Sequence, residues 1–158
     1  MFRKVLYPTD FSEVATRALE YIKQLKPAGA QEVVILHILD RKELRNLALL
    51  GGVTGNYPID LNTEFKRLEN EHLENVRNIV NELKTAGFSA KGIVREGNPL
   101  AEILKTAEDE AVSVIVIGST GKSNLQETIL GSVSEGVIKR SCQPVLIIKR
   151  DTRQGGHV

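Results

Sequence analysis

The sequence has a single cysteine, Cys142, and therefore cannot form a disulfide within the chain. Its three histidines, His37, His72 and His157, stand far apart along the chain, whereas structural zinc sites draw their ligands from closely spaced pairs. These absences exclude a disulfide-stapled domain and a zinc finger. They indicate the reducing cytosol, so we expect a cytoplasmic protein.

An excess of charge of one sign and long apolar runs are also lacking. The chain has 21 Lys and Arg residues against 20 Asp and Glu residues, a formal charge of +1, which gives no broad basic surface for nucleic acid. No apolar run approaches the roughly 18 residues that a membrane helix needs, and the N-terminus does not read as a signal peptide. We therefore expect neither nucleic acid nor a membrane as a partner.

The sequence does contain enough hydrophobic residues for one core. Its 158 residues, 41% of them hydrophobic, are close to the length of one domain, about 150 residues. Five short apolar segments alternate with four amphipathic helical patterns; the apolar segments are 5–7, 33–39, 89–95, 112–117 and 145–148. This alternation predicts an α/β fold, in which a parallel sheet lies between two layers of helices.

We expect one domain over residues 1–150, followed by a polar, disordered tail at 151–158. Residues 41–60 interrupt the alternation of strands and helices. This segment is rich in turn-forming residues, and its glycines, Gly51, Gly52 and Gly55, are suited to be hinges. We expect it to be a mobile excursion that can fold over a neighbouring cleft.

A glycine-rich loop, residues 118–132, connects a buried strand to the start of a helix. In parallel α/β sheets, ligands bind beyond the carboxyl ends of the strands, where the strand order reverses. Glycine lets backbone N–H groups approach an anion, and a helix N-terminus adds further N–H donors and partial positive charge. The loop therefore predicts a phosphate site.

Two common phosphate-binding motifs do not fit this loop. Gly121-Lys122-Ser123 resembles the end of a P-loop, but that motif needs a glycine where this chain has Val116. A dinucleotide fingerprint would lie in the first strand-to-helix turn, where this chain has residues 8–10, Pro-Thr-Asp. For any one glycine taken alone, a plain turn-forming role stays open.

The combined spacing is more specific than any single glycine. Gly118, Gly121 and Gly131, with Ser132 after the last, follow the pattern Gly-x2-Gly-x9-Gly-(Ser/Thr). In this the sequence resembles the universal stress proteins, and in particular their ATP-binding branch. Similarity extends to residues 6–12, 36–38 and 144–148, and it covers about residues 2–150. The resemblance implies a five-stranded parallel sheet of order 3-2-1-4-5 with about four helices on its two faces.

The resemblance also implies a set of residues that bind ATP. They are Pro8, Thr9, Asp10, Ile38, Ile117, Gly118, Gly121, Lys122, Gly131, Ser132, Val133 and Ser134. Among them, Asp10 is expected to lie near the phosphates and to hold a divalent metal, Mg²⁺ or Mn²⁺, if necessary through water. Ile38 is expected to hydrogen-bond the adenine edge through its backbone, and Gly118 to let the ribose approach. The hydroxyls and amides after Gly131 are expected to donate to phosphate.

Other residues are expected to be structural. His37 matches the usual strand histidine of the family, and no nucleophile stands beside it in the sequence, so burial is favoured over catalysis. His72, on or beside the apolar stripe of helix 61–86, is expected to pack. Thr120 departs from relatives, which often have Arg or His there. Cys142 is expected to be an inert, semi-buried thiol.

The function implied by the resemblance is that of an ATP-binding universal stress protein acting as a nucleotide-dependent switch in stress response. The alternatives are a slow ATPase or an adenylate-forming enzyme of the same nucleotide-binding superfamily, and a nucleotide-free interaction module. Family members commonly dimerise through the last strand, so the implied partners are a second copy, paired over Val145 to Ile148, and a further protein.

Overall fold

The computed structural model describes residues 1–42, 45–46, 49, 60–121 and 130–150, and within these it has the α/β architecture expected from the sequence. The strands are β1 (Lys4–Pro8), β2 (Glu32–Leu39), β3 (Ser89–Glu96), β4 (Val114–Gly118) and β5 (Val145–Ile148). The helices are α1 (Glu13–Gln24), α3 (Leu61–Thr85), α4 (Pro99–Asp109) and α5 (Ser132–Arg140), and a 3-10 turn, η1, spans Lys26–Ala28. The tail 151–158 and most of the 41–60 excursion lie outside the described residues.

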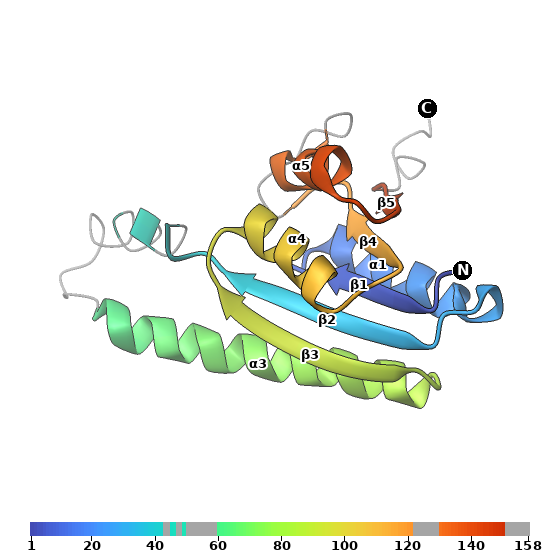
Figure 1. The fold of residues 1–158 in the computed structure, drawn as a ribbon. Helices are drawn as coiled ribbons and strands as arrows, with labels where there is room; N and C mark the ends of the chain where they lie inside the picture. Colours follow the sequence, from blue (N-terminus) through green and yellow to red (C-terminus); the bar gives the residue numbers. More distant parts are fainter. Residues whose placement is uncertain (43–44, 47–48, 50–59, 122–129, 151–158) are drawn as a thin grey trace, which may run out of the picture.

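The five strands form one parallel sheet in the order β3-β2-β1-β4-β5 (Figure 1). This confirms the order implied by the resemblance. From the central β1 the chain moves outward through β2 and β3, and then returns to build β4 and β5 on the other side of β1. The strand order therefore reverses between β1 and β4, and a ligand is expected at the carboxyl ends of these two strands.

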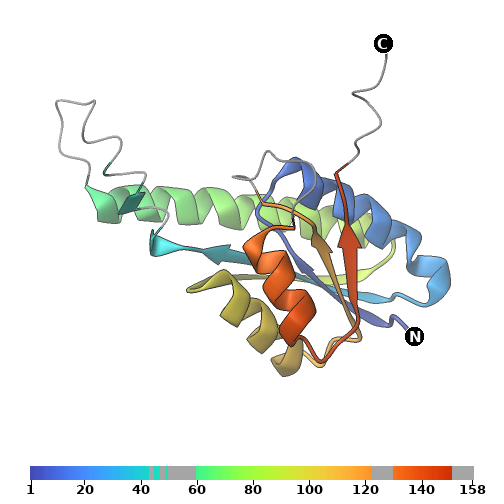
Figure 2. The same cartoon turned by 90° about the horizontal axis from the view of Figure 1, so that it is seen from above.

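Helices cover both faces of the sheet (Figure 2). Alternate residues of β1 point to opposite faces, so Val5 and Tyr7 join the core under α1 and α3, whereas Leu6 joins the core under α4 and α5. Ile22 and Leu83 contribute to the first core. Burial on both faces explains why the central strands are nearly continuous apolar runs in the sequence.

Local signals set the ends of the helices that border the sheet's carboxyl edge. Ser12 caps α1, and its side chain accepts a hydrogen bond from the Ala15 N–H at 3.3 Å. Asn98 caps α4 in the same way, 3.0 Å from the Ala101 N–H, with Pro99 at the first helical position. Ser and Asn are both residue types favoured at helix N-caps.

Cys142 differs from its expected environment. It follows α5 in the turn that leads into β5, and its side chain is exposed rather than semi-buried. A short surface turn leaves it no neighbouring layer under which to be buried.

Candidate functional site

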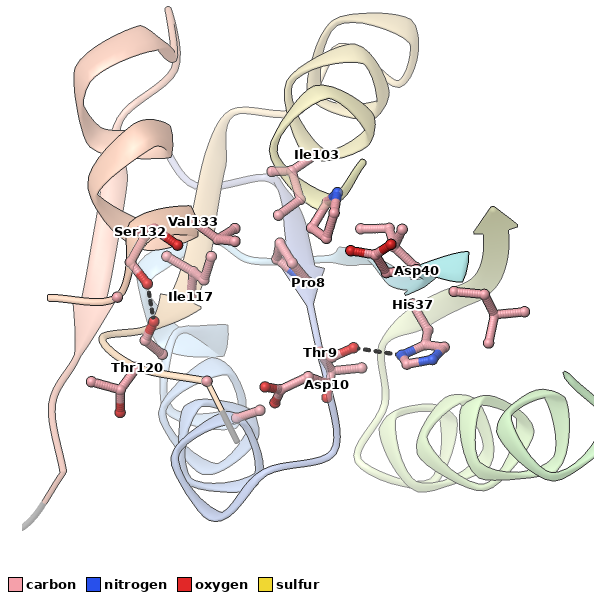
Figure 3. A pocket seen from close by; sticks show the side chains of 18 of the residues that line it. Pro8, Thr9, Asp10, His37, Asp40, Ile103, Ile117, Thr120, Ser132 and Val133 are labelled. Atoms are coloured by element: carbon pink, nitrogen blue, oxygen red, sulfur yellow. Dashed lines mark hydrogen bonds between the residues drawn. The ribbon is translucent and has the colours of Figure 1, made fainter. Parts of the chain in front are cut away.

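A cavity of about 490 Å³ lies beyond the carboxyl ends of β1, β2 and β4 (Figure 3). This volume falls within the range of about 300–1,000 Å³ typical of small-molecule sites. Its described walls are Pro8, Thr9, Asp10, Ala15, His37, Ile38, Leu39, Asp40, Leu68, His72, Pro99, Ile103, Ile117, Gly118, Thr120, Gly121, Gly131, Ser132, Val133 and Ser134. The site therefore sits where the strand order reverses.

The structure brings together the residues that were named from the sequence. All of them line this cavity except Lys122, which lies outside the described residues. They come from the end of β1, the end of β2, the end of β4 and the start of α5. Convergence of four separate segments on one cavity is what a binding site requires.

The loop after β1 is held by its own side chains. The Ser12 N–H donates to Asp10 Oδ1 at 2.9 Å, and the Phe11 N–H donates to Thr9 Oγ1 at 3.1 Å. The Asp10 carboxylate therefore has a local structural role at one oxygen, and it also lines the cavity. Buried Tyr7 connects β1 to the first turn of α1, because its hydroxyl donates to the Ala15 carbonyl at 2.6 Å. Desolvation by burial raises the pKa of Tyr7 to about 12, so the hydroxyl keeps its proton at neutral pH.

The N-terminus of α5 forms a further part of the wall. Its N-cap residue, Gly131, has no side chain to accept from the first turn, and no side-chain cap is found there among the described residues. The Gly131 N–H donates to Ser119 O at 2.8 Å, which fixes the start of the helix. Backbone N–H groups of the first turn, residues 132–134, are thus placed at the cavity with the positive end of the helix dipole.

The Ser134 side chain is committed within the protein. Its hydroxyl is buried and donates to the Gly118 carbonyl at 2.8 Å. The hydroxyl proton that the sequence-based interpretation assigned to phosphate is therefore used to join α5 to the end of β4. What Ser134 can offer an anion as a donor is its backbone N–H.

The three motif glycines differ in what a side chain at each position would contact. At Gly118 a Cβ would lie 2.8 Å from Val14 Cγ1, so close packing of α1 against β4 already requires glycine there. At Gly121 a Cβ would lie 3.1 Å from Asp10 Oδ2. At Gly131 the nearest atoms would be at 3.5 Å, an ordinary contact. Gly121 is therefore the glycine whose lack of a side chain directly accommodates Asp10.

The backbone of Ile38 is directed past the end of β1. The Thr9 N–H donates to Leu36 O at 2.9 Å, so the backbone carbonyl of Leu36 faces β1. The Gly97 N–H donates to Leu39 O at 3.1 Å, so the backbone carbonyl of Leu39 faces β3. Backbone groups of successive strand residues point to alternate sides. Ile38 therefore shares the side of Leu36, where β1 has ended, and its N–H and C=O point toward the cavity.

Several wall residues were not identified from the sequence. Pro99 and Ile103 come from the first turns of α4, and Ile103 is buried. The start of a helix directly after β3 was the available signal, because it places these residues at the sheet's carboxyl edge. Asp40 also lines the cavity, and its Oδ1 accepts from the Lys42 N–H at 2.9 Å. Thr120 Oγ1 is buried with no hydrogen-bond partner in the described part of the chain.

His37 and His72 form a hydrogen-bonded pair at the cavity wall. His37 Nδ1 lies 2.8 Å from Thr9 O, and His37 Nε2 lies 2.8 Å from His72 Nδ1 (Figure 3 shows the first of these). Phe11 stacks on His37 with ring centroids 4.4 Å apart. The expectation that His37 is buried is confirmed. The pairing was not expected, because the two residues lie on different elements, β2 and α3.

Charge in the described walls is acidic. Asp10 and Asp40 are the charged side chains that line the cavity within the described residues. Among the described residues, an anionic ligand would therefore meet backbone N–H groups together with these two carboxylates, and a cation beside Asp10 would favour its binding. No group of three or more His, Cys, Asp or Glu side chains suited to a metal ion occurs in the described part of the chain.

None of the helices within the described ranges has both the length and the apolar composition needed to cross a membrane.

The chain is similar to known proteins over nearly its whole length. Residues 1–149 match the family described as "Universal stress protein family". Universal stress protein MJ0577 of Methanocaldococcus jannaschii is 46% identical over 95% of this chain and 96% of its own. The solved structure of MJ0577 superposes with a TM-score of 0.82 at 43% identity, covering 96% of this chain and 99% of that one. Universal stress protein YxiE of Bacillus subtilis is 34% identical over 94% of this chain and 100% of its own.

Two further solved members share the fold and were obtained with nucleotides. One is an Arabidopsis thaliana family protein with AMP bound, with a TM-score of 0.65 at 17% identity over 97% of this chain and 95% of that one. The other is a universal stress protein in complex with cAMP, with a TM-score of 0.59 at 20% identity over 94% of this chain and 97% of that one. The family match and the identity to two full-length relatives establish that this chain belongs to the universal stress protein family.

Proposed function

We propose that this protein binds ATP in the cavity beyond β1, β2 and β4, and that the bound nucleotide acts as a switch in a stress response. The observation that carries the proposal is the meeting of three features in one cavity: the open N-terminus of α5, the carboxylate of Asp10 against Gly121, and the outward backbone edge of Ile38. Each suits a different part of a nucleotide.

The phosphates fit the α5 side of the cavity. Ser132, Val133 and Ser134 offer backbone N–H donors at the positive end of a helix, which is a favourable place for an anion. These donors do not depend on side-chain charge, so the near-neutral chain can still hold a polyanion.

A divalent cation, Mg²⁺ or Mn²⁺, fits between the phosphates and Asp10. Mg²⁺ commonly takes one or two carboxylates, several waters and substrate phosphate oxygens. Asp10 supplies one carboxylate, directly or through water, and the phosphates would supply the remaining charged ligands. The cation would thus enter with the nucleotide, which agrees with the absence of a larger ligand cluster from the described residues.

The base fits between the end of β2 and α4. The N–H and C=O of Ile38 provide one donor and one acceptor, which matches the hydrogen-bonding edge of adenine. Pro99 and Ile103 provide an apolar surface beside it. The AMP and cAMP complexes of two family members support an adenine nucleotide as the class of ligand.

Binding is favoured over hydrolysis as the main activity. His37 has both ring nitrogens in hydrogen bonds, to Thr9 O and to His72, and so is poorly placed to act as a general base. We expect at most slow or partner-dependent hydrolysis. Multiple turnovers at ordinary enzyme rates, about 1 s⁻¹ or faster, by the pure protein would instead favour the ATPase alternative.

The proposal is tested in two steps. Native mass spectrometry of the freshly purified protein should show a co-purified mass that matches an adenine nucleotide. After removal of that ligand, isothermal titration calorimetry with ATP and Mg²⁺ should show one site per chain, with AMP and cAMP as competitors. Absence of binding in calorimetry would reject the proposal and favour a nucleotide-free interaction module.

We also propose that two copies pair through β5. This strand bonds to β4 on one side and is the last in the sheet, so its other edge is open in the described structure. Leu146 on this strand is 37% exposed. A further partner protein would bind this dimer differently depending on whether ATP is bound to it.

A further inference from the structure

The His37–His72 pair lies beside the proposed nucleotide site without belonging to the motif that predicted it. His37 is on β2 and His72 on α3, and both line the cavity. His37 bridges two elements, because its Nδ1 contacts Thr9 O and its Nε2 contacts His72 Nδ1, each at 2.8 Å. The pair therefore connects α3 to the loop that carries Asp10.

Hydrogen-bond chemistry determines the tautomers of the neutral pair. A carbonyl can only accept, so His37 Nδ1 carries the hydrogen that is donated to Thr9 O. In the neutral ring His37 Nε2 is then the acceptor, and His72 Nδ1 must donate to it. His72 thus selects the tautomer of His37 that can bond Thr9, which is how an outer partner usually orients a functional histidine.

The bond from His37 to Thr9 ends the ladder between β1 and β2. The last backbone hydrogen bond between these segments in the described residues runs from the Thr9 N–H to Leu36 O. If the ladder continued in the same parallel register, the next bond would join the Ile38 N–H to Thr9 O. His37 Nδ1 occupies that carbonyl instead. The Ile38 backbone edge is thereby left to a ligand.

The same imidazole supports a strained residue beside Asp10. Phe11 has a φ of +62°, which is costly for a bulky residue and persists only where its surroundings hold it. Its ring stacks on His37 at 4.4 Å and is tilted against His72 at 5.3 Å. Holding Phe11 in this conformation sets the direction of the chain that follows Asp10.

We infer that His37 is a positioning residue for nucleotide binding: by capturing the Thr9 carbonyl it frees the Ile38 edge for the base and fixes the Asp10 loop for the phosphates, while His72 holds it in the required tautomer. This inference rests on the proposed ATP site. In this role the two histidines act on the nucleotide through Thr9, Ile38 and the Asp10 loop, and neither histidine needs to contact the ligand itself.

The two ring nitrogens of His37 can be tested separately. In His37→Asn the amide nitrogen takes the place of Nδ1 and can still donate to Thr9 O, whereas in His37→Gln the longer side chain reaches toward His72 and loses Thr9. We expect calorimetry with ATP and Mg²⁺ to show about a tenfold weaker affinity for His37→Gln and a smaller loss, at most about threefold, for His37→Asn. His72→Asn should bind nearly as wild type, and His72→Leu should weaken binding because the tautomer is no longer selected.

A core variant separates positioning from stability. Val76 is buried on α3, one turn after His72, and Val76→Ala lowers stability without touching the cavity. It should retain wild-type affinity even if its melting temperature falls as far as that of His37→Gln. The inference would be overturned if His37→Gln and His37→Asn bound ATP with equal affinity. It would also be overturned if Val76→Ala lost ATP affinity in proportion to its loss of stability. Failure of the wild type to bind ATP would instead reject the proposed function.

Discussion

Gly121 and Asp10 lie next to each other in the cavity wall: a Cβ on Gly121 would lie 3.1 Å from Asp10 Oδ2. One residue follows β4 and the other follows β1, the two strands between which the sheet order reverses. The carboxylate is therefore held at the edge of the glycine loop, where a cation could join it to phosphate.

Substitution Gly121→Ala should lower ATP affinity by about tenfold in calorimetry, because the added methyl displaces the Asp10 carboxylate. The fold should persist, since the backbone of Gly121 is not in the left-handed region. Gly29→Ala is the matched control. Gly29 has a φ of +99° and is not among the residues that line the cavity, and a Cβ there would meet only Met1 N, at 3.9 Å. The control should therefore lose about 1–2 kcal/mol of stability and keep its affinity. Wild-type affinity in Gly121→Ala would contradict the prediction.

Asp10→Asn should separate the structural and charge roles of this side chain. The amide oxygen can still accept from the Ser12 N–H, so the loop and the start of α1 should be retained. Removal of the charge should abolish most of the gain in ATP affinity that Mg²⁺ gives, and should leave metal-free binding equal or tighter because a repulsive carboxylate is gone. Titrations with and without Mg²⁺ measure both effects. An undiminished Mg²⁺ gain in the variant would show that the metal is held elsewhere.

Ile147→Pro should dissociate the proposed dimer while sparing the monomer. Ile115 N–H donates to Pro144 O at 2.9 Å and Ser119 N–H donates to Ile148 O at 2.8 Å. By alternation, the N–H of Ile147 points to the open edge of β5, where proline removes a donor without breaking the β4–β5 ladder.

Light scattering at micromolar concentration should give a dimer mass for the wild type and a monomer mass for Ile147→Pro. The contrasting variant is Leu146→Pro, whose lost N–H faces β4, and it should lower the free energy of unfolding by about 1–3 kcal/mol because a hydrogen bond of the β4–β5 ladder is lost. A monomeric wild type would reject pairing through β5.

Tyr7→Phe should lower stability at neutral pH by about 1 kcal/mol, because the buried hydroxyl bond to the Ala15 carbonyl is lost. Burial raises the pKa of Tyr7 from 10.0 to about 12. The neutral form is thus favoured by folding, so this contribution is complete below pH 10 and is lost as the pH rises toward 12. Urea unfolding at several pH values should show the difference between wild type and variant narrowing over that interval. A constant difference would mean that Tyr7 ionises alike in the folded and unfolded chains.

The sequence by itself determined the elements and their order. Apolar runs, helical stripes and caps such as Ser12 and Asn98 are encoded by neighbouring residues, so the strands and helices could be placed to within a few positions. The α/β class followed from their alternation. The glycine loop indicated phosphate because its position between a strand and a helix is also a local property. The sheet order and the set of ATP-binding residues came from the family resemblance.

Only the tertiary structure decided which residues from distant parts of the sequence contact one another in the site. The Gly118 spacing is visible in the sequence, but its close contact with Val14 depends on how α1 packs on β4. The sequence also does not show that the Ser134 hydroxyl donates a hydrogen bond to Gly118 O. The His37–His72 bond joins β2 to α3, and neither residue carries a local signal for the other. These contacts form between elements that are far apart in the sequence. They depend on how the elements pack in the folded protein, and no local sequence pattern specifies that packing.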